Sequence, residues 1–113
     1  MSANNEQKVT NFCMSWLNGD LGASAVYLSE DVEYHNMPWD PVTGHAGFLQ
    51  VFKQFVRDDV NMLQKMDILH SASSGNIVMN ERLELWVLGD VRMELPVLGM
   101  FELNGEGKIL RWH

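Results

Sequence analysis

The sequence predicts an α+β domain in which three N-terminal helices pack on one face of a curved, mostly antiparallel β-sheet. In the first half of the chain apolar residues recur with the period of a helix, and from about residue 62 they alternate with the period of a strand. Turn sequences rich in Gly, Asn and Ser separate the later segments. Helices that come first and strands that come last favour one layer of each. We therefore expect residues 1–113 to form a single domain.

The first two helices are expected at about residues 6–17 and 20–28. The first carries one apolar stripe at helical spacing. Gly19 is a typical helix terminator, and Asp20 is a typical N-cap for the helix that follows. These two residues place the boundary between the helices.

A strand is expected to begin at residues 33–36, followed by a turn or loop over the proline-bounded residues 37–41. A third helix opens at Thr43 or Gly44. Its apolar positions are Phe48, Leu49, Phe52, Phe55 and Val56.

The second half predicts four strands joined by hairpin turns. The strands are expected at about residues 62–71, 76–88, 91–103 and 108–112. The turns fall at residues 73–76, 89–90 and 104–107, which contain the Gly, Asn and Asp residues that such turns need.

Charge and composition limit the classes of binding partner that the sequence favours. Fifteen Asp and Glu against eight Lys and Arg give a net charge of −7, and no window is rich in basic residues. This argues against nucleic acids and anionic membranes as partners. No run approaches the roughly 20 apolar residues of a membrane-spanning helix, and the first ten residues do not resemble a secretory signal. We expect a cytoplasmic protein.

The sequence predicts neither a metal nor a cofactor. The four histidines are dispersed, and Cys13 is the single cysteine, so the residue types of a zinc site are not grouped. The common nucleotide-binding and hydrolase motifs do not occur. Any chemistry is therefore expected to use side chains and water.

The strand at residues 80–88 is the most informative segment. Its alternation places Asn80, Arg82, Glu84 and Trp86 on one face of the sheet and Glu81, Leu83, Leu85 and Val87 on the other. Because both sets contain apolar residues, both faces are expected to be covered, one by the helices and the other by a second copy of the chain. The sequence therefore predicts a homodimer through the convex face. The alternative is a solvated Arg82–Glu84 pair on an open face.

Tyr34 and Asn36 are two positions apart, so they share a face near the end of their strand. Together with Arg82 and Glu84 they would supply a phenol, an amide, a guanidinium and a carboxylate. A few such polar groups among apolar side chains are typical of a small-molecule pocket. The alternative is a plain strand end with a turn-forming asparagine.

Five segments resemble the limonene-1,2-epoxide hydrolase family: YHNMP at 34–38, PVTGH at 41–45, ERLE at 81–84, PVLGMFE at 96–102 and GKILRW at 107–112. The resemblance covers nearly the whole chain. It implies a cone-shaped, cystatin-like roll on a mixed sheet, as in nuclear transport factor 2, steroid isomerases and polyketide cyclases. Because that fold has many functions, the Tyr-x-Asn-Met-Pro and Glu-Arg-x-acid segments carry the functional part of the resemblance.

The resemblance also implies roles for individual residues. In the family, an Asp-Arg-Asp set opens an epoxide in one step, with one carboxylate as base for water, the other as acid for the epoxide oxygen, and Arg between them. Carried over, Tyr34 and Asn36 hold the water, Arg82 is the bridging guanidinium and Glu84 is the general acid. Leu63, Trp86, Leu95 and Val97 are expected to line the substrate pocket.

Two positions depart from the family pattern. Glu84 stands where the family has Asp, which moves the carboxyl group by one methylene, and catalysis is sensitive to such displacements. The family's second carboxylate follows the tryptophan by two positions, whereas here Trp112 is followed by His113 and the sequence ends. We expect this sequence to be a truncated part of a longer polypeptide. Strand alternation disfavours His113 as the base, because it should face away from the side used by residues 112 and 114.

Three functions remain open from the sequence. The first is hydrolysis of a small, apolar epoxide to a vicinal diol without a cofactor. The second is a non-catalytic module of the same fold that binds a small neutral molecule or mediates dimerisation. The third is a ketosteroid-isomerase-like or polyketide-cyclase-like enzyme, which Arg82 disfavours because such an isomerase needs a neutral acid where Arg82 stabilises a charged one.

Overall fold

The computed structural model describes residues 2–36, 39–56 and 61–113 of the chain. Its helical elements are α1 (Ser2–Ser15), the 3-10 turn η1 (Trp16–Asn18), α2 (Leu21–Ala25) and α3 (Gly44–Phe52). Its strands are β1 (Leu28–Tyr34), β2 (Val42–Thr43), β3 (Leu63–Ser74), β4 (Ile77–Leu88), β5 (Val91–Leu103) and β6 (Ile109–Trp112). None of the helices in these ranges is long and apolar enough to cross a membrane.

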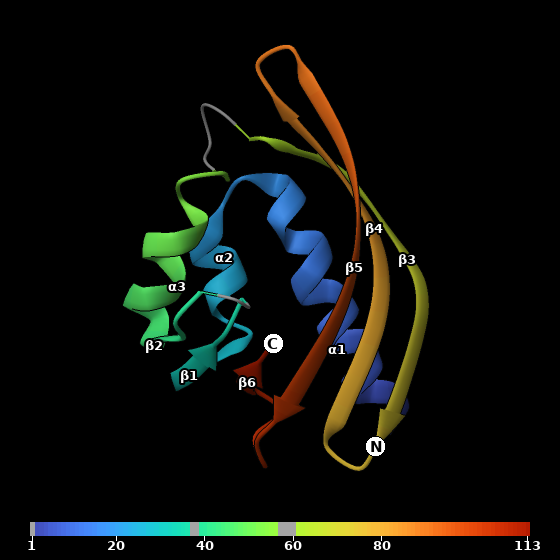
Figure 1. Ribbon diagram of the computed structural model, residues 1–113. Coiled ribbons are helices and arrows are strands. Elements are labelled where there is room, and N and C mark those ends of the chain that lie inside the picture. The colour runs from blue at the N-terminus through green and yellow to red at the C-terminus, as the bar shows by residue number, and fades with distance from the viewer. Residues whose placement is uncertain (1, 37–38, 57–60) are drawn as a thin grey trace.

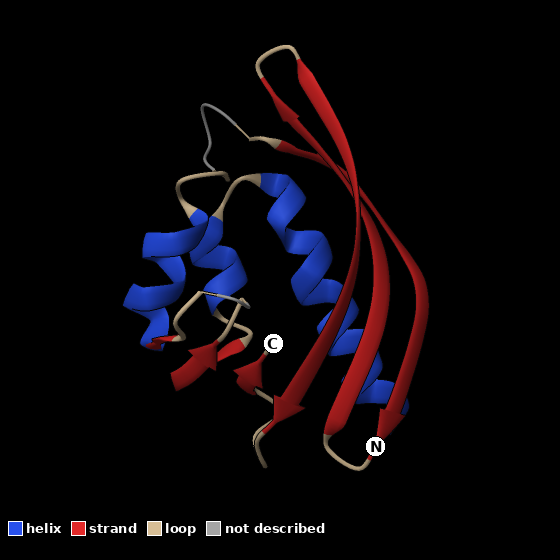
Figure 2. Ribbon diagram, viewed as in Figure 1, coloured by secondary structure: helices blue, strands red, loops and turns tan. Residues whose placement is uncertain are grey.

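The strands form one curved six-stranded sheet in the order β2-β1-β6-β5-β4-β3 (Figure 1). Only the β1–β6 pair is parallel among the described strands, so the sheet is mixed and mostly antiparallel, as the resemblance implied. The helices lie on the inner side of its bend (Figure 2), and α1 packs along the long strands β3 and β4. The expected α+β class is therefore confirmed.

The core lies between α1, α3 and the inner face of the sheet. Phe12 of α1 and Phe48 of α3 are fully buried, and their ring centroids are 6.0 Å apart. Trp112 of β6 lies beside both rings and stacks on Phe101 of β5 at 5.8 Å. Offset and edge contacts of this kind hold aromatic cores together. This cluster fixes the end of β6 against the neighbouring strands, next to the cavity described below.

Several boundaries differ from the sequence expectation. The second helix ends at Ala25 and β1 begins at Leu28, five residues earlier than expected. The reason is a partner from the far end of the chain, because Leu28 pairs with Ile109 of β6. The third helix ends at Phe52, and Val56 instead forms an isolated bridge with Asn61. The expected N-cap is confirmed, since the Asp20 carboxylate accepts a hydrogen bond from the Ala23 N–H at 3.1 Å.

Candidate active site

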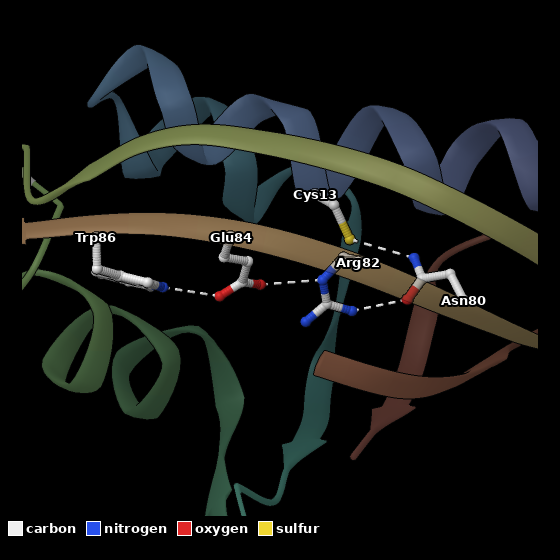
Figure 3. Close-up of polar contacts among 5 residues, drawn as sticks. All are labelled: Cys13, Asn80, Arg82, Glu84 and Trp86. Carbon is white, nitrogen blue, oxygen red and sulfur yellow. Dashed lines mark hydrogen bonds and ion pairs between the residues drawn. The ribbon is translucent and has the colours of Figure 1, made fainter. Parts of the chain in front are cut away.

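The candidate site is built on alternate residues of β4 that face the helices. Asn80, Arg82 and Glu84 are each 4 % exposed, so this polar row is buried rather than solvated. Burying charged groups is unfavourable unless they are paired and hydrogen-bonded. These side chains therefore need hydrogen-bond partners, and Figure 3 shows that they form a hydrogen-bonded network.

The row is joined end to end by hydrogen bonds. Arg82 Nε donates to Glu84 Oε2 at 3.0 Å, and Arg82 Nη1 donates to Asn80 Oδ1 at 2.7 Å. The indole N–H of Trp86 donates to the other carboxylate oxygen, Glu84 Oε1, at 2.9 Å. At the far end, Asn80 Nδ2 donates to Cys13 Sγ at 3.7 Å. Both oxygens of Glu84 therefore accept an N–H, which is the arrangement that a carboxylate favours.

Aromatic rings enclose the guanidinium of Arg82. Its central carbon lies 5.5 Å from the ring centroid of Trp16 and 6.0 Å from that of Phe101, within cation–π range. Gly99, next to the ring of Phe101, leaves room for the guanidinium, since a Cβ at that position would lie 2.5 Å from Arg82 Nη1. The position of Arg82 thus depends on its two hydrogen-bond partners, on two rings and on the missing side chain at Gly99.

A cavity of about 300 Å³ opens over this row. Its polar lining includes Arg82, Glu84, Tyr34 and Asn36, and its apolar lining includes Trp86, Leu95 and Val97. The structure thus brings seven of the eight expected site residues to one cavity. The eighth, Leu63, is 1 % exposed, lies in the core and is not among the lining residues. Met37 and Pro38, which complete the Tyr-x-Asn-Met-Pro motif, lie outside the described residues.

Tyr34 stands at the end of β1 against the aromatic core. Its ring stacks on Trp112 with centroids 4.0 Å apart. Burial raises the pKa of Tyr34 to about 12, while the nearby Arg82 lowers it and Glu84 raises it. The phenol therefore keeps its proton at any physiological pH and remains a hydrogen-bond donor toward the cavity. His113, which also borders the cavity, is exposed and packs its ring against His35 at 5.7 Å.

The high pKa of Tyr34 makes a prediction about stability at alkaline pH. A group with a pKa of about 12 in the folded state and 10.0 as its ordinary value contributes stability that is complete below pH 10 and is lost as the pH rises toward 12. Urea unfolding across that window should show this loss, and Tyr34→Phe should reduce it. An equal loss in Tyr34→Phe would mean that Tyr34 is not the group responsible.

The thiol of Cys13 also affects stability in this alkaline pH range. Burial raises the pKa of its thiol to about 11, so its contribution is lost between its ordinary value of 9.0 and about pH 11. The comparison of wild type with Tyr34→Phe removes the contribution of Cys13, because both proteins contain it. A Tyr27→Phe variant controls for the other tyrosine.

Several residues of the site are not evident from the sequence as site residues. Strand alternation predicts the face on which Asn80 lies, but it does not predict the hydrogen bond from Arg82 to Asn80. Trp16 looked like an ordinary apolar position of the first helix, yet it borders the cavity and stacks over Arg82. Its buried indole N–H has no hydrogen-bond partner among the described residues. A donor of this kind is rare in protein interiors, and a ligand oxygen beside it would satisfy it.

A second, larger hollow of about 540 Å³ lies on the outer face of the sheet. Its lining includes His70, Glu81, Met79 and Leu98, and the His70 ring nitrogen Nδ1 lies 2.7 Å from Glu81 Oε1. Arg82 and Glu84 do not border it. Among the described residues, no group of three or more His, Cys, Asp or Glu side chains could hold a metal ion.

The curved sheet, the helices on its inner face and the cavity over a buried polar row define the cone-shaped class of α+β domains that includes nuclear transport factor 2. The family model of the limonene-1,2-epoxide hydrolase catalytic domain matches residues 3–113. The chain therefore belongs to the limonene-1,2-epoxide hydrolase family.

Comparison with solved structures supports the fold. The chain is similar to an LEH-like epoxide hydrolase from M. tuberculosis, with a TM-score of 0.81 and 20% sequence identity, over 98% of this chain and 80% of that one. A search among curated protein sequences gives no match. At this level of identity the structural likeness shows the shared fold and not a shared substrate.

Proposed function

We propose that the protein hydrolyses a small, apolar epoxide to a vicinal diol without a metal or cofactor. The observation that carries the proposal is the buried Arg82–Glu84 ion pair at the wall of an apolar cavity, with Tyr34 and Asn36 beside it. A cavity of about 300 Å³ with few polar groups favours a small neutral ligand over a charged one. Membership of the epoxide hydrolase family supports the same reading.

The reaction needs one water, one proton donor and one proton acceptor. The water oxygen forms a bond to one epoxide carbon while the bond from that carbon to the epoxide oxygen breaks. Glu84 can give a proton to the epoxide oxygen when it shares one proton with the second carboxylate that the family places beside the arginine, and that second carboxylate takes a proton from the water. Tyr34 and Asn36 are suited to hold the water, because both border the cavity and carry hydrogen-bonding groups. Arg82 stabilises the charge that remains on Glu84.

The proposed reaction also needs a base that takes the proton from the water. In the family a second carboxylate sits beside the arginine, two positions after the tryptophan. Within the residues that the structure describes, Glu84 is the one carboxylate in ion-pair contact with Arg82. A second candidate function is that the cavity binds a small neutral molecule and does not turn it over. The buried indole N–H of Trp16, which has no hydrogen-bond partner among the described residues, supports it as a donor for such a ligand.

One comparison distinguishes the two functions. The 113-residue chain and a variant with one aspartate added after His113 are each incubated with a neutral alicyclic epoxide in the presence of a chelator, and diol formation is measured. Hydrolysis that rises at least ~100-fold with the added carboxylate supports the proposed enzyme. Equal, substantial activity of both forms would place the base elsewhere. Thermal stabilisation by the epoxide with no diol from either form would support the binding module.

The proposal includes a homodimer through the outer face of the sheet. Leu83, Leu85 and Val87 are half-buried there, but Leu98 is 81 % exposed and Met79 is 50 % exposed in the hollow on the same face. Exposed apolar residues grouped on a sheet face are typical of an interface. Sedimentation at micromolar concentration should show a dimer, and Leu98→Glu should convert it to a monomer. A monomeric wild-type protein at that concentration would contradict this expectation.

A further inference from the structure

The carboxylate of Glu84 is held from both sides by residues of its own strand. Arg82 and Trp86 precede and follow it by two positions, so all three side chains leave the same face of β4 (Figure 3). Arg82 Nε donates to one oxygen and the Trp86 indole N–H donates to the other. The two donors therefore fix the direction of the carboxylate as well as its distance from Arg82.

We propose that Trp86 is a positioning residue for Glu84, and that this tryptophan allows the longer glutamate to do the work of the family's aspartate. The inference rests on the proposed function. A glutamate has one more rotatable bond than an aspartate, so its carboxylate needs an additional restraint to stay in one orientation. The indole N–H supplies that restraint, and Trp86 also borders the cavity.

The contact between Glu84 and Trp86 leads to a prediction about placing the family's aspartate at position 84. Glu84→Asp shortens the side chain by one C–C bond, about 1.5 Å, so the carboxylate can no longer reach both donors. We expect Glu84→Asp to lower kcat by ~10-fold or more, even though it restores the family's aspartate. Trp86→Phe keeps a flat apolar ring but removes the N–H, and we expect a similar loss in kcat with a smaller change in KM.

A double-mutant cycle separates positioning from simple packing. If Trp86 acts through Glu84, Trp86→Phe should cost ~10-fold in kcat in the wild type and less than ~3-fold when Glu84 is already Asp. Trp86→His, which keeps a ring N–H, should recover part of the activity. Trp39→Phe is the matched control, because Trp39 is 68 % exposed and lies outside the cavity lining. Equal losses from Trp86→Phe in both backgrounds would overturn the proposal.

The hydrogen bond can be tested without turnover. The chain has four tryptophans, so a nitrogen–proton NMR spectrum should show four indole signals, of which Trp86→Phe identifies one. Glu84→Gln should move that signal upfield, because the indole then bonds a neutral amide instead of a carboxylate, and it should leave the Trp39 signal in place. If the Trp86 signal does not respond, the contact is absent and the positioning role is wrong. If it responds but no variant forms diol, the contact stands, and both the proposed function and the catalytic part of this inference fail.

Discussion

Arg82→Ala is expected to lower kcat for epoxide opening at least ~100-fold and to lower the free energy of unfolding by about 3–5 kcal/mol. The arginine is the central member of the buried row, and its removal leaves the carboxylate of Glu84 and the amide oxygen of Asn80 without their shared donor. A buried charge without its partner is destabilising, and the same loss removes the cation that stabilises the charge left on Glu84 after proton transfer. Urea unfolding and initial rates of diol formation measure the two effects.

The matched control for Arg82→Ala is Arg111→Ala. Arg111 is exposed on β6, and its contact with Glu102 at 3.7 Å is a surface ion pair. Such pairs contribute about 0–1 kcal/mol, so this variant should keep nearly the full stability and activity. If Arg82→Ala resembles Arg111→Ala in both measurements, the buried row does not hold the site together.

Gly99→Ala is the second change with a large expected effect. A methyl group there would lie 2.5 Å from Arg82 Nη1 and 3.2 Å from Asn80 Oδ1, so the arginine must move. Moving the guanidinium would weaken its hydrogen bonds to Asn80 and Glu84 and its contact with the ring of Trp16. We expect unfolding to become easier by about 1–3 kcal/mol and kcat to fall at least ~10-fold.

The control for Gly99→Ala is Gly105→Ala in an exposed turn. A Cβ at Gly105 meets no atom within 4 Å, so the same chemical change carries no steric cost there. Comparing the two variants separates the contact with Arg82 from the general effect of replacing glycine. A fully active, fully stable Gly99→Ala protein would show that Arg82 can shift freely and that its observed position is not required.

Strand alternation alone predicted much of the candidate site. In β4 it places residues 80, 82, 84 and 86 on one face, and the structure finds them on the inner face in one hydrogen-bonded row. The same alternation placed Tyr34 and Asn36 together near the end of a different strand, and the family resemblance added their expected role in holding the water. The fold class followed from the change in period between the two halves of the chain.

Contacts between distant segments could not be predicted from local pattern. The early start of β1 depends on its pairing with β6, more than 70 residues away, and Leu28↔Ile109 is part of that pairing. Leu63 has the apolar character of a lining residue, but its strand turns it into the core. The Trp86–Glu84 bond depends on side-chain direction along one strand, which alternation allows but does not specify. The open space at Gly99 likewise becomes visible only when Arg82 is placed.

Diol formation in isotopically labelled water tests most directly whether Glu84 and Arg82 open an epoxide with water. A neutral alicyclic epoxide is incubated near neutral pH, with a chelator, with the wild-type sequence and with Glu84→Gln, each with one aspartate added after His113. We expect a diol that carries one labelled oxygen, formed at least ~100-fold faster by the form that keeps Glu84. Equal rates of diol formation by the two forms, or no diol above the uncatalysed rate from either, would contradict this mechanism.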